Sequence, residues 1–150
     1  KKKKKKKKNT HIQKYPIKSY NLDAREFIQQ LAQQVMDQKL PLAQHILMNL
    51  PKIGIEFLDV FVNLFQHITD KSLLSPITIH VYCFENEEET DQIKIRIEKA
   101  LKHHQIPSLT LHHVRGVAPN KEMYCATFIL PVSILTGQSP STNTNKRRKL

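Results

Sequence analysis

The sequence predicts an α/β fold, the second half of a doubly wound sheet that ends in an antiparallel hairpin. Three observations support this prediction. Strand-like and helix-like segments alternate over residues 15–104, the order that builds a parallel sheet with crossover helices. Two strand-like segments then follow with a turn-forming stretch between them. At 150 residues the chain is long enough for a modest core but short for a complete doubly wound domain.

The first predicted elements are a short strand and an amphipathic helix. Residues 15–22 alternate in polarity like a strand, with Pro16 near the start, where a missing N–H donor is tolerated. Asp23 and Glu26 stand at the spacing of a helix capping box, and capping by Asp23 is worth about 1 kcal/mol. Apolar residues then recur at helical spacing until Pro41 closes the helix: Phe27, Ile28, Leu31, Val35 and Met36.

The middle of the chain holds a turn that presents a candidate site residue. Residues 43–48 form a nearly unbroken apolar run, which predicts a parallel strand buried on both faces. Asn49 ends the run and Pro51 cannot donate to a sheet, so the chain turns there into an apolar helix expected over residues 55–68. Ligands of open α/β sheets bind beyond the carboxyl ends of strands, which makes Asn49 a candidate binding residue. The alternative is that Asn49 serves only the turn.

The later elements have clear local signals. Residues 77–84 alternate β-branched and aromatic side chains and predict a strand. A helix follows, with an acidic start at residues 85–91 and a basic end at residues 99–104. Because both ends complement the helix dipole, we interpret these charges as helix stabilisation and not as a metal cluster. Residues 109–115 and 123–130 predict the two strands of the hairpin.

Half of the basic residues lie at the two ends of the chain. The formal net charge is +11, but residues 1–8 and 146–149 hold 12 of the 24 Lys and Arg residues. The other 12 basic residues face 13 acidic ones, so residues 9–145 carry a net charge of −1. We therefore expect two disordered basic tails around a folded part that is not a basic nucleic-acid groove.

Composition and spacing exclude several kinds of site. With glycine only at Gly54, Gly116 and Gly137, no glycine-rich phosphate loop can form. Cys83 and Cys125 stand far apart in predicted strands and are interpreted as free thiols in a reducing compartment. Neighbouring histidines on a strand point to opposite faces, so the pair in the hairpin cannot chelate one ion and no metal is expected. No apolar run approaches the ~20 residues of a membrane span, so a soluble intracellular protein is expected.

Four blocks of sequence resemble one known family. They are NLDAREFI at residues 21–28, MNLPKIGIEFLD at residues 48–59, IHVYCF at residues 79–84 and VRGVAPNKEM at residues 114–123. In this order they resemble the C-terminal half of the archaeal and eukaryotic type of tRNA (guanine-37-N1)-methyltransferases. A related wybutosine-pathway transferase family shares the fold, but the Asn-Leu-Pro block fits the guanine methyltransferases better.

The resemblance implies an activity and a set of site residues. The activity is the transfer of a methyl group from S-adenosyl-L-methionine to N1 of the guanine next to the tRNA anticodon. Asp23 and Ala24 would bind the cofactor, with Asp23 contacting its adenine. Asn49 would lie near the methionine moiety and the target base, as a cofactor-binding and catalytic residue, while Pro51 shapes the catalytic turn. In-line transfer needs sulfur, methyl and N1 aligned, and a rigid strand end can enforce that alignment.

The implied organisation is a polylysine tail over residues 1–10, a partial class I (Rossmann-like) methyltransferase domain over residues 11–136 and a basic tail over residues 137–150. The family's glycine loop, ribose-holding acid, general base and tRNA-binding domain have no counterpart in this sequence, so the chain by itself is expected to be inactive. The complete enzyme is expected to be a monomer that acts on the tRNA anticodon region, without metal or membrane, in the cytoplasm, nucleus or mitochondrial matrix. The alternative is a catalytically dead α/β remnant that holds RNA or other polyanions non-specifically through its basic tails.

Overall fold

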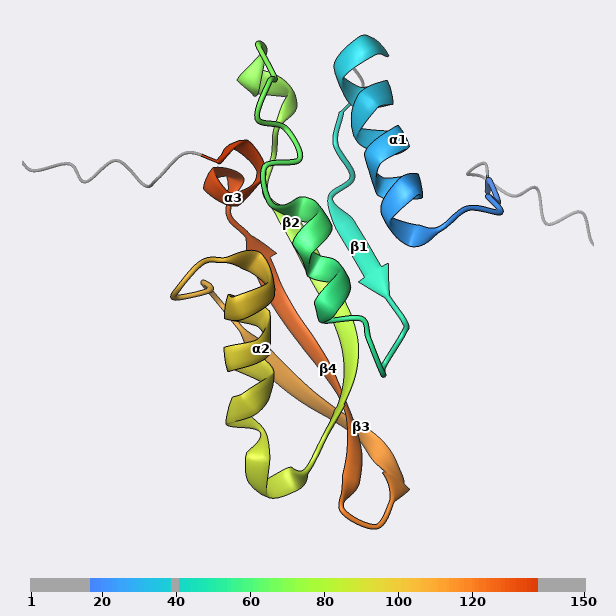
Figure 1. The fold of residues 1–150 in the computed structure, drawn as a ribbon, viewed down its shortest axis with the longest axis vertical. Helices are drawn as coiled ribbons and strands as arrows, with labels where there is room; N and C mark the ends of the chain where they lie inside the picture. The colour runs from blue at the N-terminus through green and yellow to red at the C-terminus, as the bar shows by residue number, and fades with distance from the viewer. Residues whose placement is uncertain (1–16, 39–40, 138–150) are drawn as a thin grey trace, which may run out of the picture.

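A computed structural model describes residues 17–38 and 41–137 of the chain; the predicted tails lie outside this part, apart from Gly137. The described residues form a four-stranded mixed sheet in the order β1-β2-β4-β3, with its helices packed on one face (Figure 1). The helices and strands are α1 (Ala24–Gln38), β1 (His45–Met48), β2 (Ile77–Glu85), α2 (Asp91–Leu101), β3 (Thr110–Ala118), β4 (Lys121–Leu130) and α3 (Val132–Thr136). Three 3₁₀ helices complete the fold: η1 (Glu56–Phe61), η2 (Lys71–Leu73) and η3 (Glu87–Glu89).

The sheet combines a parallel pair with an antiparallel hairpin, as the sequence predicts. β1 runs parallel to β2, with His45 opposite Thr78. β4 runs antiparallel to β2 and to β3, so the last strand of the chain is inserted between its two neighbours. The α/β class and the terminal antiparallel hairpin are therefore confirmed.

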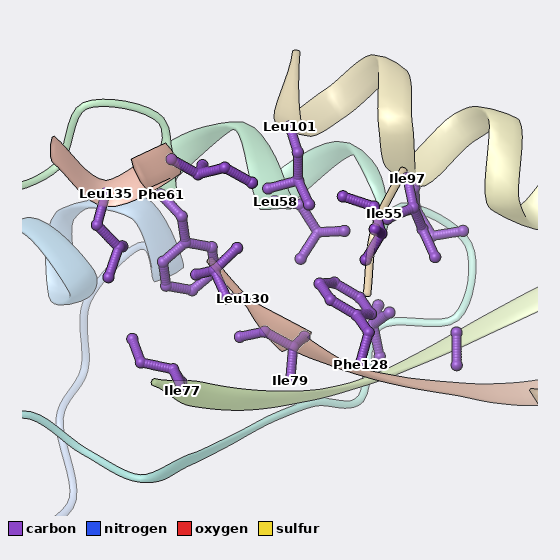
Figure 2. Packing of buried hydrophobic residues seen from close by; sticks show 14 of the residues in the cluster. Ile55, Leu58, Phe61, Ile77, Ile79, Ile97, Leu101, Phe128, Leu130 and Leu135 are labelled. Carbon is purple, nitrogen blue, oxygen red and sulfur yellow. The ribbon is translucent and has the colours of Figure 1, made fainter. Parts of the chain in front are cut away.

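The core lies between the sheet and the helical layer (Figure 2). β2 alternates buried and half-buried residues, which is the pattern of a strand with one face on the core. From the other side, α2 contributes the buried Ile93, Ile97 and Leu101 at helical spacing, and η1 contributes Leu58 and Phe61. These apolar contacts hold η1 against the sheet, directly after the turn predicted to carry the site.

Two predicted strands differ from the structure. Residues 17–22 form no strand, and Ile17 is 77% exposed, because no strand of the described sheet lies beside them. β1 is half-buried or exposed along its length, whereas its apolar sequence predicts burial on both faces. The reason is its position, since β1 is one of the two edge strands of the described sheet and Leu47 is 66% exposed.

The predicted helix over residues 55–68 is a 3₁₀ helix followed by turns. The Asn63 and Phe65 N–H groups donate to the carbonyl oxygens of Ile134 and Leu135, at 2.9 and 2.7 Å, and not to carbonyls one α-helical turn earlier. Asn63 also adopts a left-handed φ of 61°. The C-terminal helix α3, which no sequence signal predicted, thus takes the backbone donors that an α-helix would have used.

Candidate functional site

An apolar pocket lies at the carboxyl end of β1, the end at which ligands of open α/β sheets bind. Its volume is about 210 Å³. The start of α1 forms one wall, η1 forms the opposite wall, and β1 with the turn after it forms the floor. The lining residues are Ala24, Phe27 and Ile28 from α1, Phe57, Val60 and Phe61 from η1, and Ile46, Leu47, Met48, Asn49 and Leu50 from the floor.

The turn after β1 is held by backbone hydrogen bonds and by close packing. The Gly54 N–H donates to the Leu50 carbonyl oxygen at 2.6 Å, which closes the turn. The Phe84 N–H donates to the Pro51 carbonyl oxygen at 3.2 Å, which ties the turn to β2. A Cβ at Gly54 would lie only 3.0 Å from the Leu50 carbonyl oxygen, so a side chain there would push the turn away from the sheet. Asn49 is thereby displayed on a rigid turn, exposed at the pocket.

Of the four predicted site residues, the structure brings Ala24 and Asn49 together on the lining of this pocket. Asp23 directly precedes Ala24 and Pro51 stands two residues after Asn49, and neither lines the pocket. Asp23 caps α1, because its Oδ1 accepts the Arg25 N–H at 2.9 Å and its carbonyl accepts the Phe27 N–H at 2.9 Å. The side-chain hydrogen bond of this cap uses Oδ1 of the carboxylate.

The predicted cap at Asp23 is confirmed, but the reciprocal half of the capping box is not. The Glu26 carboxylate accepts from the Gln30 side-chain amide at 3.0 Å, one helical turn further along α1. Asp23 therefore caps the helix alone, through its own side chain.

Sequence reasoning missed Arg25, which joins the two walls of the pocket. Its guanidinium forms an ion pair with Asp59 of η1 at 3.1 Å and lies 4.0 Å from the ring centroid of Phe57. One signal could have indicated it: a basic residue in the first turn of a helix opposes the helix dipole, so its partner must lie outside the helix.

The histidines and cysteines do not build a second site. His113 of β3 contacts the Glu122 carboxylate, with its Nε2 2.7 Å from a carboxylate oxygen. Cys83 and Cys125 are free thiols, and burial raises the pKa of Cys83 from 9.0 to about 11. Within the described ranges, no three His, Cys, Asp or Glu side chains are grouped to hold a metal ion.

No helix among the described residues has the length and hydrophobicity to cross a membrane.

The fold and the pocket define a class of protein, an open α/β sheet with an apolar pocket at the carboxyl end of a strand. Open α/β sheets bind small ligands at this position. No family model matches the chain, and no solved structure matches it. Several curated proteins do match the chain.

The chain is similar to proteins named tRNA (guanine(37)-N(1))-methyltransferase from several eukaryotes. It is 34% identical to the one from Theileria parva, in a match that covers 81% of this chain and 30% of the relative. It is 38% identical to the one from Danio rerio over 123 residues (79% and 25%) and 38% identical to the one from Phytophthora infestans over 139 residues (89% and 32%).

These relatives confirm the resemblance that the four sequence blocks predict. Over the matched segment, the chain is a relative of the tRNA (guanine(37)-N(1))-methyltransferases. It spans between a quarter and a third of the length of the relatives it matches.

Proposed function

We propose that this chain is part of an S-adenosyl-L-methionine-dependent tRNA (guanine-37-N1)-methyltransferase and supplies one half of the cofactor site. The main support is the pocket at the end of β1. Ala24 and Asn49 belong to separate blocks of the resemblance, and the fold brings them to one apolar pocket. The curated proteins that match most of this chain are named for this enzyme, which supports the same proposal.

The pocket fits a part of the cofactor. Sites for whole small molecules usually measure about 300–1,000 Å³, so a pocket of 210 Å³ has room for a portion of S-adenosyl-L-methionine. In the proposed arrangement, Asp23 accepts a hydrogen bond from the adenine amine beside Ala24. Asn49 holds the methionine end near the target base, and Pro51 keeps the turn rigid. The bound cofactor supplies an electrophilic methyl group, and these residues orient it.

The remainder of the site is proposed to come from a part of the enzyme that this sequence does not encode. In this proposal the catalytic domain is class I (Rossmann-like), and the complete protein acts as a monomer on the anticodon region of tRNA. It needs no metal, does not bind a membrane, and works in the cytoplasm, nucleus or mitochondrial matrix. The purified 150-residue chain is accordingly expected not to methylate an unmodified tRNA transcript.

A chimeric enzyme tests the proposal. In it, residues 17–137 of this chain replace the matching segment of the Danio rerio relative, and methylation of a tRNA transcript is followed with radiolabelled cofactor. We expect an active chimera, in which Asn49→Ala lowers cofactor affinity by about tenfold or more because a hydrogen bond to a charged ligand is lost. The matched control is Gln92→Ala, which removes an exposed amide on α2, away from the pocket. An active chimera that is indifferent to Asn49→Ala would refute the assigned site.

The rival function is non-specific polyanion binding by a catalytically dead remnant. The observation in its favour is that half of the 24 basic residues lie in residues 1–8 and 146–149. This function predicts RNA binding that is blind to sequence, weakens steeply with salt and disappears when both runs are deleted. Inactivity of the chimera together with such binding by the full chain would favour it.

A further inference from the structure

Arg25 lies at the point where the two walls of the pocket meet. It belongs to the first turn of α1, directly after Ala24, which lines the pocket. Its Nε donates to Oδ1 of Asp59 at 3.1 Å and its Nη2 donates to Oδ2 of Asp59 at 3.2 Å. This two-bond fork between a guanidinium and a carboxylate fixes orientation as well as distance, which a single contact does not.

The same guanidinium also lies against an aromatic residue of the pocket. Its central carbon is 4.0 Å from the ring centroid of Phe57, and Phe57 lines the pocket from the η1 side. A cation at this distance over a ring face is attracted to it. Arg25 therefore contacts both the carboxylate that anchors η1 and the aromatic ring that η1 presents to the pocket.

The role of the Arg25–Asp59 ion pair follows from its location and not from its strength. The Arg25 and Asp59 side chains are 39% and 49% exposed, and ion pairs in such positions contribute little to stability. α1 is held to the core by the buried Ala32 and Val35 in any case. The contact adds a constraint at the amino end of α1, where the helix borders the pocket.

We propose that Arg25 is a positioning residue that, through Asp59 and Phe57, holds the first turn of α1 against η1 and so sets the width of the pocket. The proposal adds a positioning residue to the cofactor site of the proposed function. It rests on that function for the identity of the ligand, whereas the geometry of the pocket walls does not depend on it. Arg25 acts through its neighbours and is assigned no contact with substrate.

The chain offers a matched control in Arg96. This arginine reaches η1 from the other flank, from α2, and pairs with Glu56 at 2.8 Å. Neither Arg96 nor Glu56 lines the pocket. Replacing Arg96 therefore removes ion pairs to Glu56 of the same 3₁₀ helix and to Glu85 of β2, and leaves the contacts between α1 and η1 in place.

Thiol labelling of the full chain tests the proposal. Val60→Cys places a reporter inside the pocket in a Cys125→Ser background, and the reaction rate with a maleimide is measured at pH 7. Met48→Cys is a second reporter if the first destabilises the fold. Arg25→Gln should raise the rate by about tenfold, because both the ion-pair fork and the ring contact are lost. Asp59→Asn should raise it by less, up to about fivefold, because only the ion-pair fork is lost. Arg96→Gln should leave the rate within about twofold of the parent.

Two further results separate positioning from general loosening. The double variant Arg25→Gln with Asp59→Asn should react no faster than Arg25→Gln alone, because the two groups act as one contact. Arg25→Lys should restore part of the protection, since it keeps the charge but not the fork. Equal acceleration by Arg96→Gln, or no acceleration by Arg25→Gln, would overturn the proposal. Titration of S-adenosylhomocysteine into the chimeric enzyme, which has the complete site, judges the proposed function separately. Labelling that responds as expected, together with no binding by the chimera, would leave the positioning role of Arg25 in place and count against the cofactor site.

Discussion

Gly54 shows how a single residue sets the position of the binding turn. A Cβ there would lie 3.0 Å from the Leu50 carbonyl oxygen, 3.1 Å from Val81 Cγ2 and 3.2 Å from the Tyr82 carbonyl oxygen. Two of these atoms belong to the backbone, so the neighbours cannot move aside at low cost. The requirement at Gly54 is therefore close approach of the turn to β2.

Gly54→Ala should lower the free energy of unfolding by about 1–3 kcal/mol, the usual cost of overpacking a tight contact. Urea unfolding followed by circular dichroism measures the change. Gly116→Ala is the control, because its new methyl group would meet the flexible Glu122 carboxylate at 3.4 Å. If Gly54→Ala and Gly116→Ala had the same unfolding midpoint, the turn could move away from β2 at little cost, and this prediction would be wrong.

Cys83 gives a prediction about pH. Burial raises the pKa of its thiol from 9.0 to about 11, and the nearby Arg96 only partly opposes the shift. The folded state thus favours the protonated thiol, so its contribution to stability is complete below pH 9 and is lost as the pH rises from 9 to 11.

At pH 8 we therefore expect Cys83 to be nearly inert to a disulfide reagent, while the half-buried Cys125 reacts. Cys125→Ser should leave almost no reactive thiol in the native protein, and denaturant should restore one. Rapid native labelling of Cys125→Ser would mean that β2 opens easily.

At the scale of one element, α2 ends in a strained cap. Lys102 closes the helix in the left-handed conformation, with φ 51° and ψ 37°, and its N–H reaches back to the carbonyls of Glu98 and Lys99. Glycine adopts this conformation without steric cost and is the usual residue at such a helix end.

Lys102→Gly should therefore raise the free energy of unfolding, by about 0.5–1 kcal/mol after the favourable charge at the helix end is lost. Lys99→Gly, one turn earlier and inside α2, should instead lower it by about 1 kcal/mol. Thermal unfolding of both variants checks the sign, and the same sign for both would contradict this account of the cap.

At the scale of the whole molecule, the edge of the sheet governs solubility. In the part of the chain that the structure describes, β1 is bonded on one side only, to β2, and it carries the exposed Leu47. Leu50 and Ile53 in the turn after β1 are also exposed. A free strand edge beside exposed apolar side chains is a template for aggregation.

Leu47→Lys should therefore slow aggregation of the isolated chain, as measured by light scattering at increasing protein concentration. Ile95→Lys is the control, since Ile95 is similarly exposed, at 52% against 66% for Leu47, but lies on α2. Equal protection by both variants would attribute the effect to net charge. Sharp unfolding of the unaltered chain as a monomer, independent of concentration, would contradict the expected aggregation altogether.

The elements that the sequence determined are those whose signals are local. The alternation in β2, the helical spacing in α2 and the Asp23 cap are each written within a few neighbouring residues, and the structure confirms all three. The blocks that resemble the methyltransferases are equally local, so they indicate the relatives without reference to the fold.

Tertiary structure decided the features that depend on a distant partner. Residues 17–22 have the pattern of a strand but no neighbouring strand, and β1 is apolar but lies at an edge. The segment after η1 loses its α-helical bonds because Ile134 and Leu135 accept its backbone N–H groups from some 70 residues away. Likewise, Arg25 meets Asp59 and Phe57 only after α1 packs beside η1. Periodicity shows which face of a segment is apolar, but which group covers that face, or accepts its hydrogen bonds, is settled by contacts that no short stretch of sequence contains.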